Sequence, residues 1–374
     1  MRVLEINKFF PPHIGGIERV VKDIAVGVSK YVDVAVLVCA SEKSVDIRAE
    51  GSYALVEAPT LWVWLSMPVS LKFPLYLCKM TKGADVLHFH LPFPLGVISY
   101  LLLCKKKKHK VVVSWYSDIV RQKLFLAVYR WFLLLLLKKA DVVIVPAPSV
   151  INSSSFLPRF REKCVVVPIG IDVNRFLISD GERPIVDSIR EKYGERIVLF
   201  VGRLVYYKGV DVLIRAMQQI DATLLIIGDG PLKEQYKRLA DSLGIRDRIH
   251  FLSDVKDDRL VYFYHACDVF VLPSVEKSEA YGIVQLEAMA CGKPVVSTDL
   301  PTGVTFINKN GVTGVVVPVG DVSALAEAVS MLLENPELRR VYGENGRKRV
   351  REEFSVDVMN RRILEVYEKV YKEN

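Results

Sequence analysis

The sequence predicts an α/β protein made of two doubly wound domains, each built on a parallel sheet. Short apolar, β-rich runs alternate with helix-length segments along nearly all of the 374 residues. Runs that are apolar throughout are typical of parallel strands covered by helices on both faces. The chain is also too long for one ordinary hydrophobic core, so two domains are expected.

The expected strands fall into two groups separated by a polar stretch at 172–184. We place the domain boundary in this stretch, between residues 172 and 173. An amphipathic helix is expected from Asp357 to Tyr371. The expected strands are 2–7, 33–39, 85–91, 110–116, 141–147 and 164–170 before the boundary, and 196–204, 222–230, 248–254, 268–274 and 294–299 after it.

Composition narrows the class of protein. Charged residues make up 25% and apolar residues 51%, which indicates a globular chain, and the net charge of +8 suits an acidic partner. The six cysteines are scattered, which favours a reducing, cytoplasmic compartment over a disulfide framework. The apolar stretch 93–104 is too short to span a bilayer, and 124–137 is interrupted by Arg130. We therefore expect a protein that is soluble or peripheral on a membrane.

Two glycines follow the first expected strand, in the sequence GGIERVV at 15–21. Gly15 and Gly16 allow the backbone to approach a ligand closely, and the helix that follows presents N–H groups to an anion. A tight turn between strand and helix explains the same residues equally well. By itself, this motif predicts a phosphate site only weakly.

A basic loop follows the first strand of the second domain, in the sequence VGRLVYYKG at 201–209. Arg203 is suited to a bidentate phosphate contact, and Lys208 adds a point charge. A solvated basic loop is the alternative. Because ligands of doubly wound sheets bind at the carboxyl ends of the strands, we expect these two side chains to bind an anion.

Two glutamates with seven residues between them stand in the segment 278–296. On one helix, Glu279 and Glu287 would be ~12 Å apart along the axis, too far for a pair of carboxylates that share one site. The spacing suits two ends of an extended ligand, with backbone N–H groups near Gly282 facing a phosphate. Two helix-surface glutamates are the alternative, but the neighbouring residues place Glu279 at a helix start and favour the functional interpretation.

These motifs, in this order and over nearly the whole chain, resemble the retaining glycosyltransferases of family four, or group 1, which have the GT-B fold. The resemblance implies two Rossmann-like domains that face each other across a cleft. Residues 1–172, completed by the C-terminal helix at 356–374, would form the acceptor-side domain. Residues 173–355 would bind the nucleotide-sugar donor.

The resemblance also implies roles for individual residues. Arg203 and Lys208 would neutralise the donor diphosphate, and Glu287 would hydrogen-bond the ribose hydroxyls. Glu279 would contact the transferred sugar. The remaining donor contacts would be the backbone amides of Tyr281, Gly282 and Ile283, with Gly15 and Gly16 approaching from the other domain.

One position departs from the family pattern. After the strand at 110–116, relatives often carry His-Ser-Asp, with the histidine beside the sugar, whereas this chain has Tyr116, Ser117 and Asp118. Tyr116 would either donate a hydrogen bond to the sugar, which we favour, or only fill space. Asp118 is a predicted contact to sugar or acceptor. His88 and His90 share one face of a strand, but a structural pair is expected rather than a metal site, since no further ligand stands out.

The predicted reaction is transfer of a hexose, mannose as a first guess, from a GDP- or UDP-sugar to a glycan or lipid-linked acceptor with retained configuration. No Asp-x-Asp pair suggests a metal chelate, so we expect neither metal nor cofactor. A nucleotide-sugar epimerase of the same fold is the nearest alternative. A glycoside hydrolase fits less well because it needs two carboxylates ~5–10 Å apart across one bond.

The basic run Lys105, Lys106, Lys107 and Lys108 suggests an alternative from a different class, a membrane-surface binding protein without transferase activity. We weigh an anionic membrane surface equally with a solvated loop, because one polybasic cluster is a weak signal. No RNA-binding aromatic signature or recognition-helix motif is found, so no nucleic-acid partner is expected. The predicted location is the cytoplasm, with peripheral binding to the membrane's cytoplasmic face if the run contacts lipid.

Overall fold

The computed structural model describes residues 1–13, 16–40, 46–64, 67–104, 109–118 and 123–372. The chain divides into two compact units. Unit 1 comprises Met1–Gly170 with Val356–Asn374, and unit 2 comprises Ile171–Ser355. The first division therefore falls two residues before the boundary expected from the sequence, and the second falls at the expected position.

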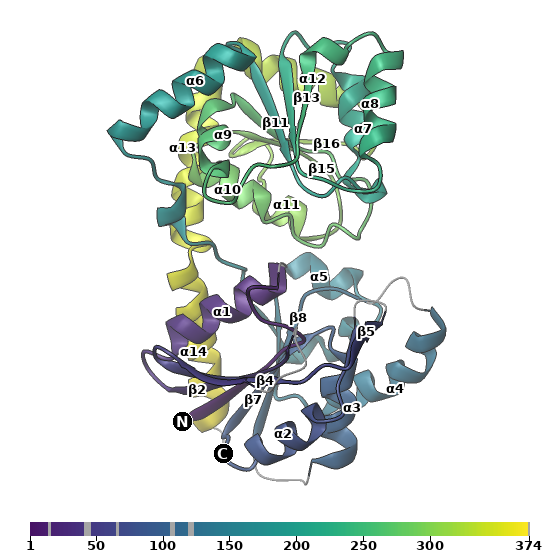
Figure 1. Ribbon diagram of the computed structural model, residues 1–374, viewed down its shortest axis with the longest axis vertical. Coiled ribbons are helices and arrows are strands. Elements are labelled where there is room, and N and C mark those ends of the chain that lie inside the picture. Colours follow the sequence, from purple (N-terminus) through teal and green to yellow (C-terminus); the bar gives the residue numbers. More distant parts are fainter. Residues whose placement is uncertain (14–15, 41–45, 65–66, 105–108, 119–122, 373–374) are drawn as a thin grey trace. The chain divides into compact units, whose positions relative to one another are not determined.

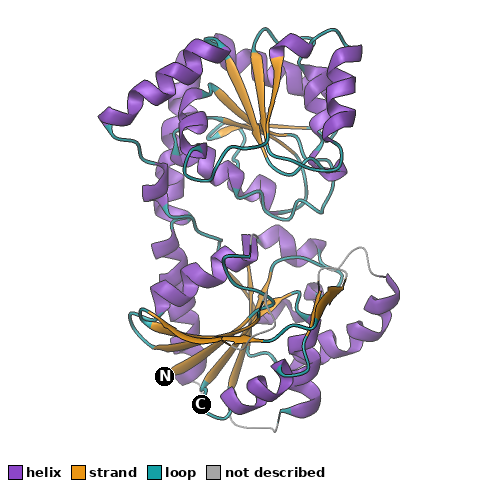
Figure 2. Ribbon diagram, in the orientation of Figure 1, coloured by secondary structure: helices purple, strands orange, loops and turns teal. Residues whose placement is uncertain are grey.

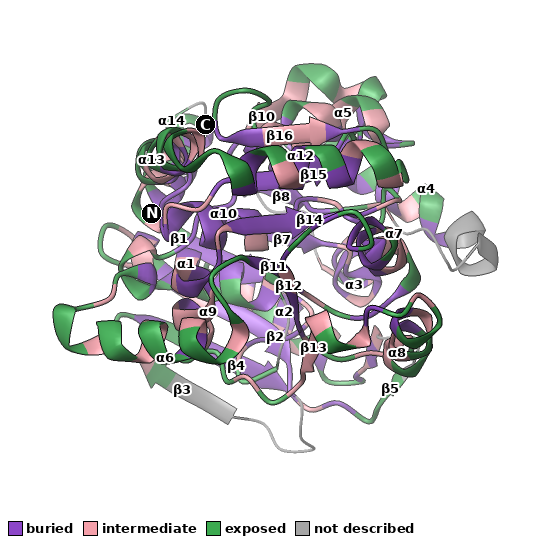
Figure 3. Cartoon of the chain, turned by 90° about the horizontal axis from the view of Figure 1, so that it is seen from above, coloured by how far each residue is buried: buried purple, intermediate pink, exposed green. Residues whose placement is uncertain are grey.

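Unit 1 contains an eight-stranded sheet in the order β10-β9-β8-β7-β1-β2-β4-β3. All neighbours are parallel except β3 and β4. The central strands β7 and β8 are buried along nearly all of their length, and Figure 3 gives the burial of each residue in colour. The strands are β1 (Arg2–Ile6), β2 (Asp33–Cys39), β3 (Asp46–Glu50), β4 (Tyr53–Ala58), β7 (Val86–Leu91), β8 (Lys110–Trp115), β9 (Val142–Val145) and β10 (Cys164–Val166), and a separate hairpin joins β5 (Trp62–Trp64) to β6 (Met67–Val69).

The C-terminal helix α14 (Val356–Lys372) returns to unit 1 and packs beside α1 (Gly16–Val28) (Figure 1). Asn360 of α14 donates a hydrogen bond to the carbonyl of Asp23 at 3.1 Å. A Cβ atom on Gly27 would clash with the Asn360 side chain, so the glycine permits this close packing. The expected C-terminal helix is thus confirmed. The other helices of this unit are α2 (Phe73–Met80), α3 (Pro94–Leu103), α4 (Lys123–Lys139) and α5 (Pro148–Ser153).

Unit 2 is built on a six-stranded sheet in the order β13-β12-β11-β14-β15-β16, parallel throughout (Figure 2). Apolar side chains of α7, α8 and α12 form one core with the strands they cover. The strands are β11 (Ile197–Val201), β12 (Thr223–Ile227), β13 (Ile249–Leu252), β14 (Val269–Leu272), β15 (Val295–Thr298) and β16 (Gly314–Val317). The helices are α6 (Arg183–Tyr193), α7 (Val210–Ala216), α8 (Lys233–Ser242), α9 (Leu260–Ala266), α10 (Val284–Ala290), α11 (Gly303–Ile307), α12 (Val322–Glu334) and α13 (Pro336–Glu353).

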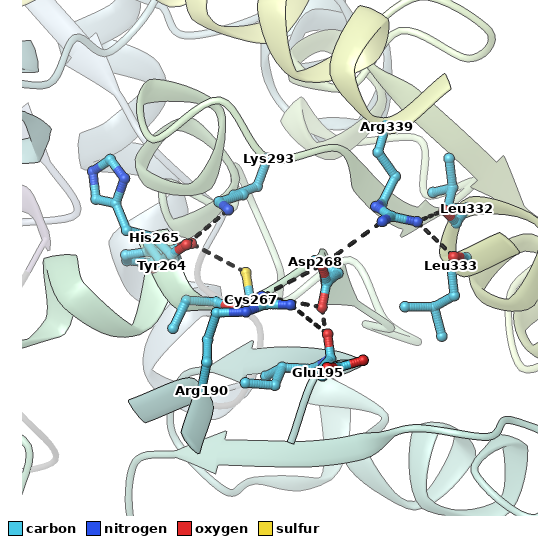
Figure 4. A network of polar contacts seen from close by, with 12 residues as sticks. Arg190, Glu195, Tyr264, His265, Cys267, Asp268, Lys293, Leu332, Leu333 and Arg339 are labelled. Atoms are coloured by element: carbon cyan, nitrogen blue, oxygen red, sulfur yellow. Dashed lines mark hydrogen bonds and ion pairs between the residues drawn. The ribbon is translucent and has the colours of Figure 1, made fainter. Parts of the chain in front are cut away.

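A polar network closes the amino-terminal edge of the unit 2 sheet (Figure 4). The carboxylate of Asp268, just before β14, accepts a hydrogen bond from the amide of Ile197 at 2.9 Å. It also pairs with Arg190 of α6 at 3.4 Å, and Arg339 of α13 reaches the backbone carbonyls that end α12. These contacts fasten α6 and α13 to the amino-terminal edge of the sheet, and they fasten α13 to the end of α12.

The α/β fold class expected from the sequence is confirmed. Every strand expected from an apolar run is present, although several end before the sequence-based bound, as β11 does at Val201. The apolar runs predict no strand between residues 46 and 69, and the structure places β3, β4, β5 and β6 there. Among the residues that the structure describes, no helix combines the length and apolar character that crossing a membrane requires.

Candidate functional site

The ends of β11 and β12 approach each other closely at the carboxyl edge of the unit 2 sheet. Gly202 follows β11, and Gly228 follows β12 with φ of +138°. A Cβ atom on Gly228 would lie 2.1 Å from the carbonyl oxygen of Gly202, so a larger residue does not fit. This contact fixes the start of the basic loop that carries Arg203 and Lys208.

Lys208 and Glu279, which come from two different motifs, meet at this edge. Lys208 Nζ lies 2.5 Å from Glu279 Oε2, and both side chains are nearly buried. Ser274, two residues after β14, donates its hydroxyl to the same carboxylate oxygen at 2.9 Å. Gly209 allows the two loops to touch, since a Cβ there would lie 2.1 Å from the carbonyl oxygen of Pro273. The sequence predicted both charged residues as site residues but did not predict that they pair.

Arg203 differs from Lys208 because its side chain is exposed. The two cations therefore have different environments, although they lie on one loop. An exposed guanidinium remains available to a phosphate, whereas the Lys208 ammonium already faces a carboxylate. The anion contacts expected for Arg203 and Lys208 stay predictions.

The expected position of Glu279 at a helix start is wrong. Glu279 lies in a turn whose amide bonds to the carbonyl of Glu276 at 3.0 Å, and α10 begins only at Val284. Gly282, with φ of +80°, separates the turn from the helix, and a Cβ there would meet Leu272 and Gln285. Because the left-handed backbone at Gly282 interrupts the chain direction, the ~12 Å helical separation does not describe this pair of glutamates.

The residues after Glu279 are buried against the sheet. The ring of Tyr281 packs on Gly303, where a Cβ would lie 2.4 Å from the ring. Ile283 is half-buried and precedes α10. The donor contacts predicted for the amides of Tyr281, Gly282 and Ile283 stay predictions.

Glu287 lies on α10 and is held by a tyrosine that the sequence analysis missed. Its Oε2 accepts a hydrogen bond from the hydroxyl of Tyr264, on α9, at 2.7 Å. Burial, followed by the charge of Glu287, raises the pKa of Tyr264 well above its ordinary value, so the phenol stays a donor. The glutamate is 9% exposed, and its role in ribose binding stays a prediction.

A second polar cluster lies under α14 in unit 1. Glu5 of β1 is the register partner of His88 on β7, and His90 is the partner of Ser114 on β8. Glu5 Oε2 lies 2.9 Å from His88 Nδ1 and 2.6 Å from His90 Nε2. Tyr367 of α14 donates its hydroxyl to Glu5 Oε1 at 2.5 Å. The cluster therefore joins the C-terminal helix to the centre of the sheet.

The ionisation of this cluster follows from its burial. Burial lowers the pKa of His90 to about 4, so its imidazole is neutral at neutral pH. Burial alone would raise the pKa of Glu5, but the attraction of His88 and the hydrogen bonds from both histidines hold it below its ordinary value. A carboxylate only accepts, so His90 Nε2 carries the proton that it donates to Glu5.

This assignment decides the direction of the hydrogen bond at Tyr116. The phenol oxygen of Tyr116 lies 2.9 Å from His90 Nδ1. Since the neutral His90 donates through Nε2, Nδ1 is an acceptor and Tyr116 is the donor. The Tyr116 proton is therefore directed into the core of unit 1, and the sugar contact that we favoured from the sequence would require this bond to break. That contact stays a prediction.

Three further site predictions fall on unit 1. The carboxylate of Asp118 accepts hydrogen bonds from the hydroxyl of Ser154 and from the amide of Ser155, both at 2.8 Å, so it orders the loop that follows α5. Gly16 is the exposed first residue of α1. Gly15 lies outside the described residues, as do Lys105, Lys106, Lys107 and Lys108.

Among the described residues, Glu5, His88 and His90 form a group whose ligating atoms could hold a metal ion. Each of the three side chains already has partners within the network: Tyr367 for Glu5, Ser114 for His88 and Tyr116 for His90. We therefore interpret the cluster as a hydrogen-bond network. Glu5 escaped the sequence analysis, although a charged residue inside an apolar strand is a signal that a buried partner exists.

Comparison with known proteins identifies the family. Residues 183–349 match the family Glycosyl transferases group 1, and residues 14–175 match Glycosyltransferase Family 4. The O-antigen chain mannosyltransferase C of Escherichia coli is 31% identical over 369 residues, 98% of each chain. The D-rhamnosyltransferase WbpZ of Pseudomonas aeruginosa is 32% identical over 95% of this chain and 92% of its own.

Two more distant proteins extend this comparison. A GDP-mannose-dependent alpha-(1-6)-phosphatidylinositol monomannoside mannosyltransferase of Mycolicibacterium smegmatis is 28% identical over 92% of each chain. The Anabaena protein HepE, solved in complex with UDP, superposes with a TM-score of 0.77 at 21% identity and covers 99% of this chain and 100% of its own. The chain thus shares the GT-B fold, and it belongs to the group 1 glycosyl transferases and is a glycosyltransferase.

Proposed function

We propose that this enzyme transfers a hexose, with mannose as the first candidate, from a GDP- or UDP-sugar to a glycan or lipid-linked acceptor. The observation that carries the proposal is the Lys208–Glu279 ion pair beside the exposed Arg203, at the carboxyl edge of the unit 2 sheet. Related proteins named as a mannosyltransferase and as GDP-mannose-dependent support mannose and a guanosine donor. HepE in complex with UDP supports uridine as the alternative base.

The reaction breaks the bond between the anomeric carbon and the diphosphate oxygen and forms a bond from that carbon to an acceptor oxygen. Negative charge develops on the leaving diphosphate, and Arg203 and Lys208 would stabilise it. Preorganised groups of this kind contribute about 3–4 kcal/mol each to transition-state stabilisation. In the retaining path that we propose, the acceptor attacks from the face of the leaving group, and the departing phosphate takes the acceptor proton.

In this scheme, Glu279 would have two roles. Its carboxylate holds the Lys208 ammonium in place before the donor binds, and it would contact a hydroxyl of the transferred sugar afterwards. Ser274 fixes the orientation of the carboxylate from the end of β14. No step in this scheme requires a metal or a cofactor.

The proposal is tested with a panel of nucleotide-sugars. A donor should raise the unfolding temperature of the full chain by mass action, and GDP-mannose should do so at a lower concentration than UDP-glucose. Turnover with a mannosyl acceptor should give a product with the donor's anomeric configuration, read by NMR, and should persist in EDTA. A product that is an isomerised nucleotide-sugar, formed without any acceptor, would identify an epimerase instead.

Binding to an anionic lipid surface is a second proposal, and it rests on unit 1. Helix α3 packs against α2 and against α4 (Figure 1), and all three helices carry exposed large apolar side chains. Exposed lysines such as Lys79 and Lys138 lie on the same helices. Apolar side chains that insert among lysines suit an anionic bilayer surface. The exposed apolar side chains are Leu75 on α2, Leu102 and Leu103 on α3, and Trp131 and Leu135 on α4.

Vesicle pelleting tests this surface. The parent protein should sediment with vesicles that contain phosphatidylglycerol, and added salt should weaken the binding. The double substitution Trp131→Ala with Leu135→Ala should reduce it, as should neutralising Lys105 to Lys108, while turnover of a soluble acceptor stays intact. If the parent protein does not bind vesicles, this second proposal is rejected, and the proposed transfer reaction is unaffected.

A further inference from the structure

Two cysteines from different helices have their sulfur atoms in direct contact. Cys78 lies near the end of α2, and Cys104 is the residue that caps the end of α3. Their Sγ atoms are 2.7 Å apart, whereas non-bonded carbon atoms, which are smaller than sulfur, have their optimal separation at roughly 3.5–4.0 Å. Because α2 and α3 pack against each other, the contact joins two regular elements of unit 1.

We propose that Cys78 and Cys104 form a disulfide bond that ties α2 to the end of α3. The proposal concerns this one bond and does not depend on the transfer reaction. The scattered cysteines favoured a reducing compartment over a disulfide framework, and one bond between two neighbouring helices is not a framework.

The other cysteines offer poorer candidates. Cys39 is buried, and the thiol of Cys164 donates to the carbonyl of Phe160. Cys267 and Cys291 are both buried, and each donates to a backbone carbonyl, at 3.3 Å and 3.8 Å. Cys78 and Cys104 are each partly exposed, so a small oxidant can reach them.

The bond requires an oxidant, which we take to be a low-molecular-weight disulfide such as oxidised glutathione. The thiolate of one cysteine attacks the oxidant, forms a mixed disulfide and releases one glutathione thiolate. The thiolate of the other cysteine then attacks the protein sulfur of that mixed disulfide and releases the second. Two protein thiols lose two protons and two electrons, and one oxidised glutathione becomes two reduced molecules.

Partial burial of Cys104, followed by its contact with Cys78, raises the pKa of this thiol to about 12. The reactive thiolate is therefore scarce at neutral pH, so the cross-link should form faster in mildly alkaline buffer. Once formed, it closes a loop that contains α3 and strand β7 with His88 and His90. A closed loop restricts the unfolded chain, which should stabilise unit 1.

The test begins with the reduced, folded full-length protein and oxidised glutathione at mildly alkaline pH. After acid quenching and denaturation, free thiols are counted and the linked peptides are mapped by mass spectrometry. The count should fall from the six cysteines of the sequence to four, with a peptide that joins Cys78 to Cys104. Cys78→Ser and Cys104→Ser should each keep all their remaining thiols, whereas the control Cys164→Ser should still form the link.

Stability gives an independent readout. All four tryptophans, at 62, 64, 115 and 131, belong to unit 1, so tryptophan fluorescence follows the unfolding of this unit. The oxidised protein should unfold at a higher temperature than the reduced protein, and Cys78→Ser should abolish the difference. Six free thiols after oxidation, a link between Cys267 and Cys291, or stable glutathione adducts without a link would each overturn the proposal.

Discussion

The ammonium group of Lys208 lies 2.5 Å from a carboxylate oxygen of Glu279, and the two side chains are only 11% and 9% exposed. The basic loop after β11 and the glutamate loop after β14 therefore share one ion pair. In the proposed function, a phosphate that draws Lys208 away would release Glu279, so anion binding would change the position of the glutamate. Lys208 therefore differs from Arg203, which comes from the same motif but is exposed.

Replacing Lys208 and Arg203 with alanine should have different consequences. Lys208→Ala leaves a nearly buried carboxylate without its cation, so it should lower the free energy of unfolding by about 3 kcal/mol and reduce activity by roughly 100-fold or more. Arg203→Ala removes an exposed cation, so it should weaken binding of the nucleoside diphosphate with no change in stability. Calorimetry of nucleotide binding and denaturant unfolding measure the two effects.

A double-mutant cycle controls for the ion pair. If the pair acts as a unit, the losses of activity in Lys208→Ala and Glu279→Gln should be clearly non-additive in the double variant. Additive losses would show that the two residues act independently. Unchanged nucleotide affinity in both Lys208→Ala and Arg203→Ala would show that neither residue binds the donor diphosphate.

Glu287→Gln should weaken binding of the ribonucleoside diphosphate far more than binding of its 2′,3′-dideoxy analogue. If the carboxylate contacts the ribose hydroxyls, the substitution reduces the affinity for the two ligands by different amounts, which calorimetry measures. Tyr264→Phe is the matched control, because it removes the hydrogen bond that Glu287 accepts without touching the carboxylate. An equal loss of affinity for both ligands in Glu287→Gln would show that this glutamate has a structural role, holding α9 against α10.

The sequence predicted those parts of the fold that repeat a local pattern. Continuous apolar runs such as residues 197–201 became parallel strands, because only a strand with both faces covered needs no polar side. Segment 46–69 lacks that pattern, since β3 pairs antiparallel with β4 alone at the sheet edge. An edge strand is specified by the strand it pairs with, and the local sequence pattern does not reveal which strand that is.

The candidate site was predictable as a set of residues but not as a set of contacts. Arg203, Lys208, Glu279 and Glu287 follow from motifs, whereas the pairing of Lys208 with Glu279 depends on which strands lie side by side. Tyr264 could not be identified because its apolar helix offers no sign of a polar partner. Glu5 left a readable signal, a charge within a buried strand, but its histidine partners required the order of β1, β7 and β8.

The stability of unit 1 should fall as the pH is lowered from about 6.5 to about 4. His90 has a folded-state pKa of about 4 against an ordinary value of 6.5, so in this window the unfolded chain binds a proton that the folded chain does not. Stability then rises with pH by up to ~1.4 kcal/mol per pH unit. The pKa of Glu5 is lowered in the folded protein, so Glu5 also stabilises unit 1. This stabilisation is lost only in more acidic solution, as the pH falls below about 4.3 toward the folded-state pKa of Glu5.

Denaturant unfolding followed by tryptophan fluorescence measures this slope for unit 1 alone. His90→Gln keeps an N–H donor for Glu5 but does not titrate, so the slope between pH 6.5 and 4.5 should flatten. His250 is the matched control, since burial also lowers its pKa but it belongs to unit 2. The same slope in His90→Gln and in the parent protein would show that another group titrates.

Three substitutions test whether the hydroxyl of Tyr116 serves the core of unit 1 or contacts the donor sugar. Its hydroxyl donates to His90 at 2.9 Å, so Tyr116→Phe leaves the buried Nδ1 atom of His90 without a donor. We expect Tyr116→Phe to lower the free energy of unfolding by about 1–3 kcal/mol, with kcat/KM nearly unchanged at a temperature where the variant is folded. Tyr116→His introduces the residue that the family resemblance implies and should be tolerated better than Tyr116→Ala, which removes both ring and hydroxyl. The opposite pattern for Tyr116→Phe, unchanged stability with kcat/KM reduced about tenfold or more, would mean that the phenol leaves His90 when the donor binds and contacts the sugar.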